Sequence, residues 1–157
     1  MVIQSHSVKD TLNIGKRIGR HLRQGDIICL CGNLGAGKTV LTKGIAEGLG
    51  IDREKVISPS FVLIRQHIHG VLPLYHFDLY RLNQPQDILA LGYEEYLYNE
   101  GVAVIEWADK LEHLLPKEFL KVELSFKDES QRMLKFIPVG RRYEDLMRKV
   151  RYEDIRN

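Results

Sequence analysis

The stretch IICLCGNLGAGKT, residues 27–39, decides the fold class of this 157-residue chain. Its last eight residues fit the phosphate-binding loop pattern G-x-x-x-x-G-K-[ST] at every fixed position. Gly35 and Gly37 can adopt backbone angles that other residues disfavour, so that successive N–H groups can turn toward a phosphate. The pattern predicts that Lys38 contacts the β- and γ-phosphates and that the Thr39 hydroxyl binds Mg²⁺. The residues expected to surround ATP or ADP are Asn33, Leu34, Gly35, Ala36, Gly37, Lys38, Thr39 and Val40.

The sequence on either side of this loop supports the same interpretation. Residues 27–31 form a continuous apolar run, which is typical of a parallel strand buried on both faces. After the loop, apolar residues at 41, 45 and 49 recur at helical spacing, and Gly48 and Gly50 predict the end of that helix. A strand, a loop and a helix in this order place a helix N-terminus against the bound anion.

Length and composition limit the class of protein. The chain of 157 residues predicts one domain, 1–157, that buries a core without disulfides or a structural metal. A net charge of +2 is too small to argue for a nucleic acid or an anionic membrane as partner. We expect a soluble cytoplasmic protein, because no apolar stretch is long enough for a membrane span and the N-terminus lacks a signal peptide's apolar core. Cys29 and Cys31 are expected to be small buried hydrophobic residues, since two thiols cannot complete a four-ligand zinc site.

The rest of the pattern predicts an α/β fold, a P-loop NTPase-like domain whose sheet mixes parallel and antiparallel strands and is flanked by helices. Residues 61–68 and 71–77 predict an antiparallel hairpin with a tight turn at 69–70. Residues 102–105 predict another central strand. Residues 120–126 alternate between apolar and polar side chains, as in a strand with one wet face, and the chain from 132 to 137 should pair back onto it.

Helices are expected at both ends of the chain and in its middle. Residues 7–10 resemble a helix-opening capping box, and an apolar stripe at helical spacing continues to residue 22. Residues 86–99 predict one or two short helices interrupted at Gly92. The tail 141–157 predicts a terminal helix, and its interspersed basic and acidic residues favour a solvated face over a nucleic-acid patch.

A phosphate-binding loop does not specify a reaction. The chain has neither the Asn-Lys-x-Asp string nor the D-x-x-G switch of a GTPase. ATP hydrolysis mainly requires positioning, Mg²⁺ and a group that orients water. Asp78 and Glu106 end two predicted strands, and the carboxyl edge of an open α/β sheet faces its ligand crevice, so Glu106 is the preferred Mg²⁺ carboxylate. Either acid alone could instead cap a helix or pair with Arg81 at the surface.

Three further segments, taken with the loop, resemble the TsaE family, the small bacterial ATPases of tRNA threonylcarbamoyladenosine synthesis. They are Ser58-Pro59-Ser60-Phe61, the string YHFDLYR at 75–81 and the pair Glu106-Trp107. The last two are far more specific than the phosphate loop, and the similarity extends from about residue 11 to residue 143. Ser60 stands where the family usually has Thr, so the hydroxyl is kept and only a methyl group is lost.

The resemblance implies an ATPase for the step that adds threonylcarbamoyl to adenosine 37 of tRNAs that read ANN codons. It implies that the protein joins the TsaD–TsaB heterodimer, whose turnover its ATP cycle permits, and that it meets tRNA through that complex. Lys38 and Thr39 would bind phosphate and Mg²⁺, and Glu106 would be the second Mg²⁺ ligand. Asp78 would be needed for the ATPase cycle, and Arg132 in the late hairpin would contact the nucleotide.

Other interpretations of these residues stay open. Taken alone, His76 is more often a packed histidine than a ligand or a base, and Trp107 fits ordinary core as well as a contact near the site. Ser58-Pro59 also fits simple turn chemistry. The function itself has two rivals: a nucleotide-gated binding module, in which ATP only orders residues 58–61 for a partner, and a small-molecule kinase.

Overall fold

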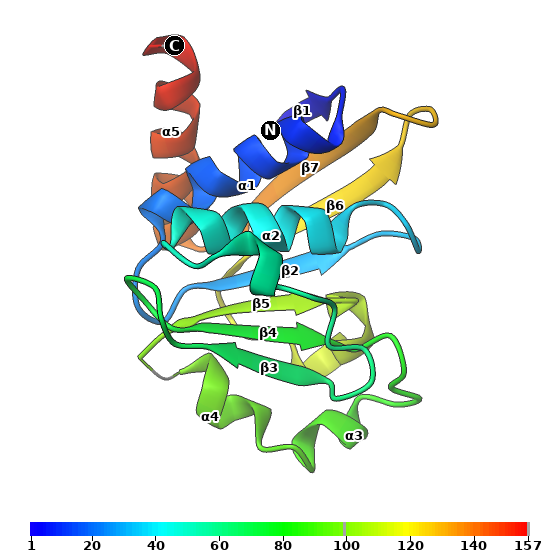
Figure 1. Ribbon diagram of the computed structural model, residues 1–157. Helices are drawn as coiled ribbons and strands as arrows, with labels where there is room; N and C mark the ends of the chain where they lie inside the picture. Colours follow the sequence, from blue (N-terminus) through cyan, green and yellow to red (C-terminus); the bar gives the residue numbers. More distant parts are fainter. Residues whose placement is uncertain (99, 157) are drawn as a thin grey trace.

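The computed structural model describes residues 1–98 and 100–156; Asn99 and Asn157, which end two of the segments expected to be helical, lie outside the described residues. Within this range a seven-stranded sheet forms the centre of the molecule, and helices cover both of its faces (Figure 1). The strands are β1 (Val2–Ser5), β2 (Ile27–Cys31), β3 (Ile64–His67), β4 (Leu74–Asp78), β5 (Val102–Glu106), β6 (Phe119–Phe126) and β7 (Arg132–Val139). The helices are α1 (Val8–His21), α2 (Lys38–Gly48), α3 (Gln86–Leu89), α4 (Tyr93–Leu97) and α5 (Arg141–Arg156), with 3₁₀ helices η1 (Arg53–Lys55) and η2 (Ala108–Leu114).

The sheet mixes parallel and antiparallel strands, as the sequence predicts. Its strand order is β1-β7-β6-β2-β5-β4-β3. The centre is parallel, because β2 pairs in parallel with β5 and β6, and β5 with β4. Both flanks are antiparallel. The carboxyl ends of β2, β4 and β5 therefore lie at one edge of the sheet, where Asp78 and Glu106 are register partners.

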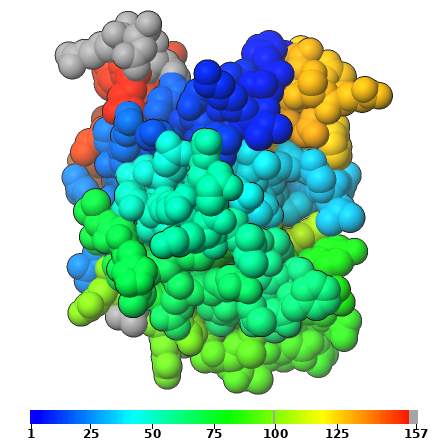
Figure 2. Space-filling view, in the orientation of Figure 1, coloured from blue at the N-terminus to red at the C-terminus, as the bar shows by residue number. Residues whose placement is uncertain are grey.

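Strand β2 is buried on both faces, which explains its continuous apolar run. Ile28 and Leu30 join the core beneath α1, α2 and α5, whereas Ile27 and Cys29 join the core beneath α3, α4 and η2. Figure 2 shows the surfaces of α1 and α2, in blue and cyan, over the upper part and middle of one face of the molecule. Cys29 is buried as predicted, while Cys31 is only half-buried. None of the described helices is both long and apolar enough to cross a membrane.

The backbones of α1 and α2 are in direct contact. The contact is formed by glycines on both helices, Gly15, Gly19, Gly44 and Gly48. A Cβ atom added at Gly44 would lie 2.3 Å from the carbonyl oxygen of Leu12, so only glycine fits there. Gly48, predicted as part of a helix stop, is thus the last residue of α2 and also a packing residue. Gly50 follows with a φ of 78°, as expected just beyond a helix end.

The hairpin predicted at 61–77 is shorter than expected. Strand β3 begins only at Ile64, because Leu63 has a φ of 68°, which lies outside the extended region. The predicted tight turn at 69–70 is wrong, since residues 68–73 form a longer connection. The N–H of Val71 in this connection donates to the carbonyl oxygen of Leu49 at 2.7 Å, which ties the loop to the end of α2.

Other parts of the prediction hold with small differences. Ser7 caps α1 and accepts a hydrogen bond from the N–H of Asp10 at 3.1 Å. The middle helical segment is divided at Gly92, whose φ is 65°. Strand β7 continues through Pro138. This proline lies beyond the last β7 residue that pairs with β1, so its missing N–H interrupts no hydrogen bond between these two strands. Strand β1 and helix η2 were not predicted.

Candidate functional site

The glycine-rich loop at residues 32–37 connects β2 to α2 and has the glycine-dependent turns that the sequence predicts. Gly35 and Gly37 have φ values of 78° and 102°, in the left-handed region that favours glycine. A Cβ atom at Gly32 would lie 2.4 Å from the carbonyl oxygen of Leu124 on β6. Among the described residues no side chain caps the N-terminus of α2. Its first amide groups are therefore available to an anion.

Lys38, the first residue of α2, is folded back toward this loop. Its Nζ donates to the carbonyl oxygens of Gly32 at 2.5 Å and Asn33 at 3.0 Å. The same Nζ lies 4.1 Å from the ring centroid of Trp107, in a cation–π contact. Burial lowers the pKa of Lys38, and nearby carboxylates partly oppose that shift. The ammonium group thus lies against the loop that the sequence pattern predicts to bind phosphate.

Glu106, the last residue of β5, is 2 % exposed and faces three polar side chains. Its Oε2 accepts a hydrogen bond from the Thr39 hydroxyl at 3.0 Å. Its Oε1 lies 2.7 Å from Nε2 of His76 and 3.4 Å from Oγ1 of Thr42. Thr39 and Glu106 therefore present a hydroxyl and a carboxylate side by side, and Mg²⁺ prefers such oxygen ligands.

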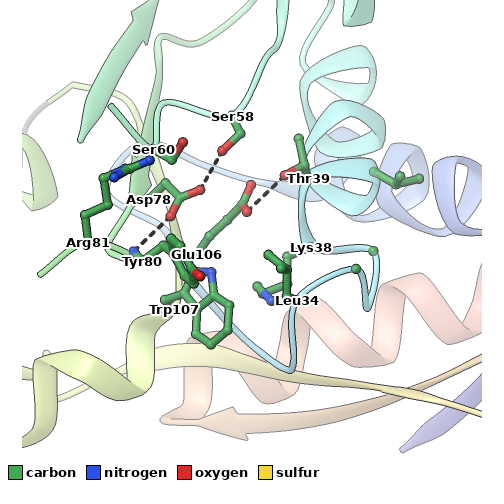
Figure 3. Close-up of a pocket in the computed structure, with 13 residues that line it drawn as sticks. Leu34, Lys38, Thr39, Ser58, Ser60, Asp78, Tyr80, Arg81, Glu106 and Trp107 are labelled. Atoms are coloured by element: carbon green, nitrogen blue, oxygen red, sulfur yellow. Dashed lines mark hydrogen bonds between the residues drawn. The ribbon is translucent and has the colours of Figure 1, made fainter. Parts of the chain in front are cut away.

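Asp78 ends β4 next to Glu106 and is held on both of its oxygens (Figure 3). The Ser58 hydroxyl donates to Oδ2 at 2.6 Å, and the N–H of Tyr80 donates to Oδ1 at 3.0 Å. Arg81, considered as a surface partner for the acids, instead lies over the ring of Phe61, with its Cζ 4.2 Å from the ring centroid. The two acids thus reach the same edge of the sheet, as the sequence predicts.

These groups line one cavity of about 390 Å³ (Figure 3). The predicted site residues that it brings together are Leu34, Gly35, Gly37, Lys38, Thr39, Val40, Ser60, Asp78, Glu106 and Trp107. The remaining lining residues are Ser58, Tyr80 and Arg81. Residues from four separate parts of the chain, 34–40, 58–60, 78–81 and 106–107, therefore meet at the carboxyl edge of the parallel strands.

Three predicted residues do not line this cavity. Asn33 is exposed, although its carbonyl contacts Lys38, and Ala36 is fully buried. Arg132, the first residue of β7, lines a second cavity of about 480 Å³. The residues common to both cavities are Gly35, Gly37 and Val40. The glycine-rich loop thus separates the acidic groups from Arg132.

Two residues that contact Glu106 without lining the cavity were also not predicted as site residues. Thr42 is fully buried one turn after Lys38, and its hydroxyl donates to the Lys38 carbonyl at 2.9 Å. His76 is packed, as its interpretation from the sequence favoured, but it also contacts Glu106. A signal for His76 was present, because an imidazole inside a strand buried on both faces needs a polar partner.

Comparison with known proteins gives consistent results. A family model described as "Threonylcarbamoyl adenosine biosynthesis protein TsaE" matches residues 5–134. The tRNA threonylcarbamoyladenosine biosynthesis protein TsaE of Bacillus subtilis (strain 168) is 42 % identical over 150 residues, 95 % of this chain and 93 % of that protein. The protein of the same name from Nostoc sp. is 39 % identical over 143 residues, 88 % of this chain and 86 % of that protein.

A solved structure resembles the whole fold. The crystal structure of YdiB from Bacillus subtilis superposes with a TM-score of 0.86 at 38 % sequence identity, covering 98 % of this chain and 95 % of that chain. The family match, the relatives and the fold agree with the resemblance carried by the segments at 58–61, 75–81 and 106–107. The chain therefore belongs to the TsaE family of threonylcarbamoyl adenosine biosynthesis proteins.

Proposed function

We propose that this chain is a Mg²⁺-dependent ATPase, converting ATP and water into ADP and phosphate in the threonylcarbamoylation of adenosine 37 of ANN-decoding tRNAs. The observation that carries the proposal is the meeting of Lys38, Thr39, Asp78 and Glu106 in one cavity beside the glycine-rich loop. Such a set combines a cation for phosphate, two oxygen ligands for Mg²⁺ and a second acid. We place this activity in the cytoplasm, where ATP and tRNA are both available.

The residues of the cavity divide the chemistry among them. The amides of the loop and Lys38 would bind the phosphates, since a helix N-terminus and an ammonium group both favour anions. Thr39 and Glu106 would hold Mg²⁺, whose charge neutralises phosphate oxygens when it is bound. Asp78, fixed by Ser58 and the Tyr80 amide, would accept a hydrogen bond from the attacking water and orient it.

We place the rest of the nucleotide in the second cavity. It shares three residues with the first and carries Arg132, whose guanidinium lies 4.4 Å over the ring of Phe126. A nucleotide whose phosphates lie on the loop could extend its nucleoside toward this side. Arg132 would then contact the nucleotide, as the family resemblance implies, while the acids act on the opposite side of the loop.

TsaD and TsaB are the proposed partners, with tRNA met through their complex. We expect slow hydrolysis by the isolated chain, because Arg81, the one arginine that lines the cavity among the described residues, is stacked on Phe61. A partner could complete the site, as arginine fingers supplied in trans do for other phosphate-loop enzymes. Turnover unchanged by saturating TsaD and TsaB would count against this partnership.

The direct test is reconstitution of tRNA modification with TsaD and TsaB. We expect repeated rounds of modification with this protein and ATP, and none beyond a single round with a non-hydrolysable ATP analogue. Product analysis separates the rivals: ADP and free phosphate without another substrate support the ATPase, whereas label transferred to a metabolite supports a kinase. Full modification with the analogue would favour a nucleotide-gated binding module.

Two variants test the roles of the site residues. Lys38→Ala should weaken nucleotide binding by roughly 100-fold, because a charged hydrogen bond to phosphate contributes up to about 3 kcal/mol. Glu106→Ala should mainly reduce Mg²⁺-dependent turnover. Calorimetric binding and a magnesium titration measure the two effects, and an unaltered magnesium dependence would remove Glu106 from the metal assignment.

A further inference from the structure

His76 occupies an unusual position for an ionisable side chain. It lies in the middle of β4, is fully buried, and pairs in register with Val104 of β5. Its Nε2 is 2.7 Å from Oε1 of Glu106, two residues further along β5. The contact joins two central strands beneath the cavity. His76 itself does not line that cavity, so it has no direct access to a ligand there.

The two oxygens of Glu106 have different neighbours. Oε2 faces the Thr39 hydroxyl at 3.0 Å, whereas Oε1 faces His76 and, at 3.4 Å, Thr42. A hydroxyl has one proton to donate, and the Thr42 hydroxyl is closer to the carbonyl oxygen of Lys38, at 2.9 Å. His76 is therefore the closer partner of Oε1. Oε2 is left beside Thr39, on the side of the cavity.

The two ring nitrogens of His76 have different surroundings. Within the described part of the chain its Nδ1 has no hydrogen-bond partner. A buried N–H without a partner is rarer and costlier than a bare acceptor nitrogen. This geometry favours the tautomer in which Nε2 donates to Glu106 and Nδ1 is the bare acceptor.

We propose that His76 is a positioning residue, which fixes Oε1 of Glu106 so that Oε2 stands beside Thr39 as a ligand for Mg²⁺. The proposal rests on the Mg²⁺-dependent ATPase function argued above. Metal-binding side chains are commonly oriented by such outer hydrogen bonds, whose loss typically costs 10- to 100-fold in metal affinity. His76 would thus act through Glu106 and touch neither the nucleotide nor the metal.

The test compares binding of a non-hydrolysable ATP analogue with Mg²⁺ and with EDTA, measured by calorimetry on the full chain. The ratio of the two affinities reports the metal contribution without any turnover. We expect His76→Leu, which removes the donor, to reduce this ratio by about tenfold and to change the affinity in EDTA by less than twofold. His76→Gln, whose amide nitrogen can replace Nε2 as a donor, should recover most of the ratio.

Two further variants separate positioning from packing. Leu74→Val, a change at a fully buried residue on the same strand, should lower stability without altering the ratio. His76→Asn is polar like His76→Gln but too short to reach Oε1, so it should behave like His76→Leu. If His76→Leu fails to fold, the comparison of His76→Gln with His76→Asn decides.

The outcomes are distinguishable. Suppose that the wild-type chain binds the analogue more tightly with Mg²⁺ and that the His76→Leu chain keeps the full ratio. The role of His76 is then overturned, while the proposed function stands. Equal losses in His76→Gln, His76→Asn and Leu74→Val also overturn it, because packing would then explain the effect. A wild-type chain that shows no magnesium effect overturns the proposed function, and the role of His76 falls with it.

Discussion

The two walls of the main cavity are built in different ways. The loop wall, residues 32–37 with α2, is backed by α1 through contacts between helix backbones. The facing wall, residues 57–63, is irregular and carries three exposed apolar side chains. The exposed fractions are 50 % for Ile57, 83 % for Phe61 and 57 % for Val62.

This difference separates a fixed half of the site from an adaptable half. Close packing of α1 on α2 fixes the start of α2, where the phosphates would bind, before any ligand arrives. The facing wall buries little apolar surface and is attached through hydrogen bonds such as that from Ser58 to Asp78. Segments with few buried contacts reorganise at a low cost in free energy, as switch segments must.

The largest effect is expected from a variant that disrupts the packing behind the loop wall. In most helices Gly→Ala stabilises by up to about 1 kcal/mol. Gly44→Ala should instead lower the free energy of unfolding by about 2–4 kcal/mol, because the new Cβ would meet a backbone carbonyl that cannot rotate away. Urea denaturation measures the change. Arg20→Ala, at an exposed position on α1, is the control, and its free energy of unfolding should stay within about 0.5 kcal/mol of wild type. A Gly44→Ala chain at least as stable as wild type would contradict the close contact of the two helices.

Nucleotide binding at the loop wall should depend on pH. Burial lowers the pKa of Lys38 below its usual 10.5, so the free protein loses this charge at a lower pH than an ordinary lysine would. Nucleotide binding needs the charged form, so affinity should fall as pH rises through the lowered pKa, by up to about tenfold per pH unit. Affinity for ADP measured from pH 7 to pH 10 tests this. A Lys38→Arg chain keeps its charge and should lose this decline, whatever its absolute affinity.

Much of the fold and of the site could be predicted, because the signals were local. The apolar run at 27–31, the glycines of the loop and the alternation at 120–126 each depend on neighbouring residues alone. The acids at 78 and 106 could also be placed, since a carboxyl edge follows from strand direction. The structure confirms these placements, except that Phe126, the last apolar residue of the alternation, is exposed.

What could not be predicted depends on contacts between distant parts of the chain. Strand β1 has only four residues and forms by pairing with β7. The contact of His76 with Glu106 depends on the register of β4 on β5, which no local pattern specifies. Gly44 was similarly hidden, since its role is defined by the backbone of another helix.

A third, smaller effect concerns the link between the two walls. Ser58→Ala removes the donor to Oδ2 of Asp78, and hydrogen bonds to charged groups contribute about 1.5–3 kcal/mol, less when the donor is exposed as Ser58 is. We expect turnover to fall about five- to tenfold, with nucleotide affinity changed less than twofold. Steady-state phosphate release and calorimetry measure the two quantities. Ser58→Thr keeps the hydroxyl and should retain activity; equal losses in both variants would assign the effect to packing.

The smallest expected effect lies in the facing wall itself. Phe61→Ala should change the free energy of unfolding by no more than about 0.5–1 kcal/mol, because the ring is exposed and its main partner is the Arg81 guanidinium. Phe77→Ala is the matched control, since the same change at a ring that is 1 % exposed should cost about 3–5 kcal/mol. Urea denaturation of both variants gives the comparison. If Phe61→Ala cost as much as Phe77→Ala, the facing wall would be as firmly packed as the loop wall, and the contrast between a fixed and an adaptable half of the site would fail.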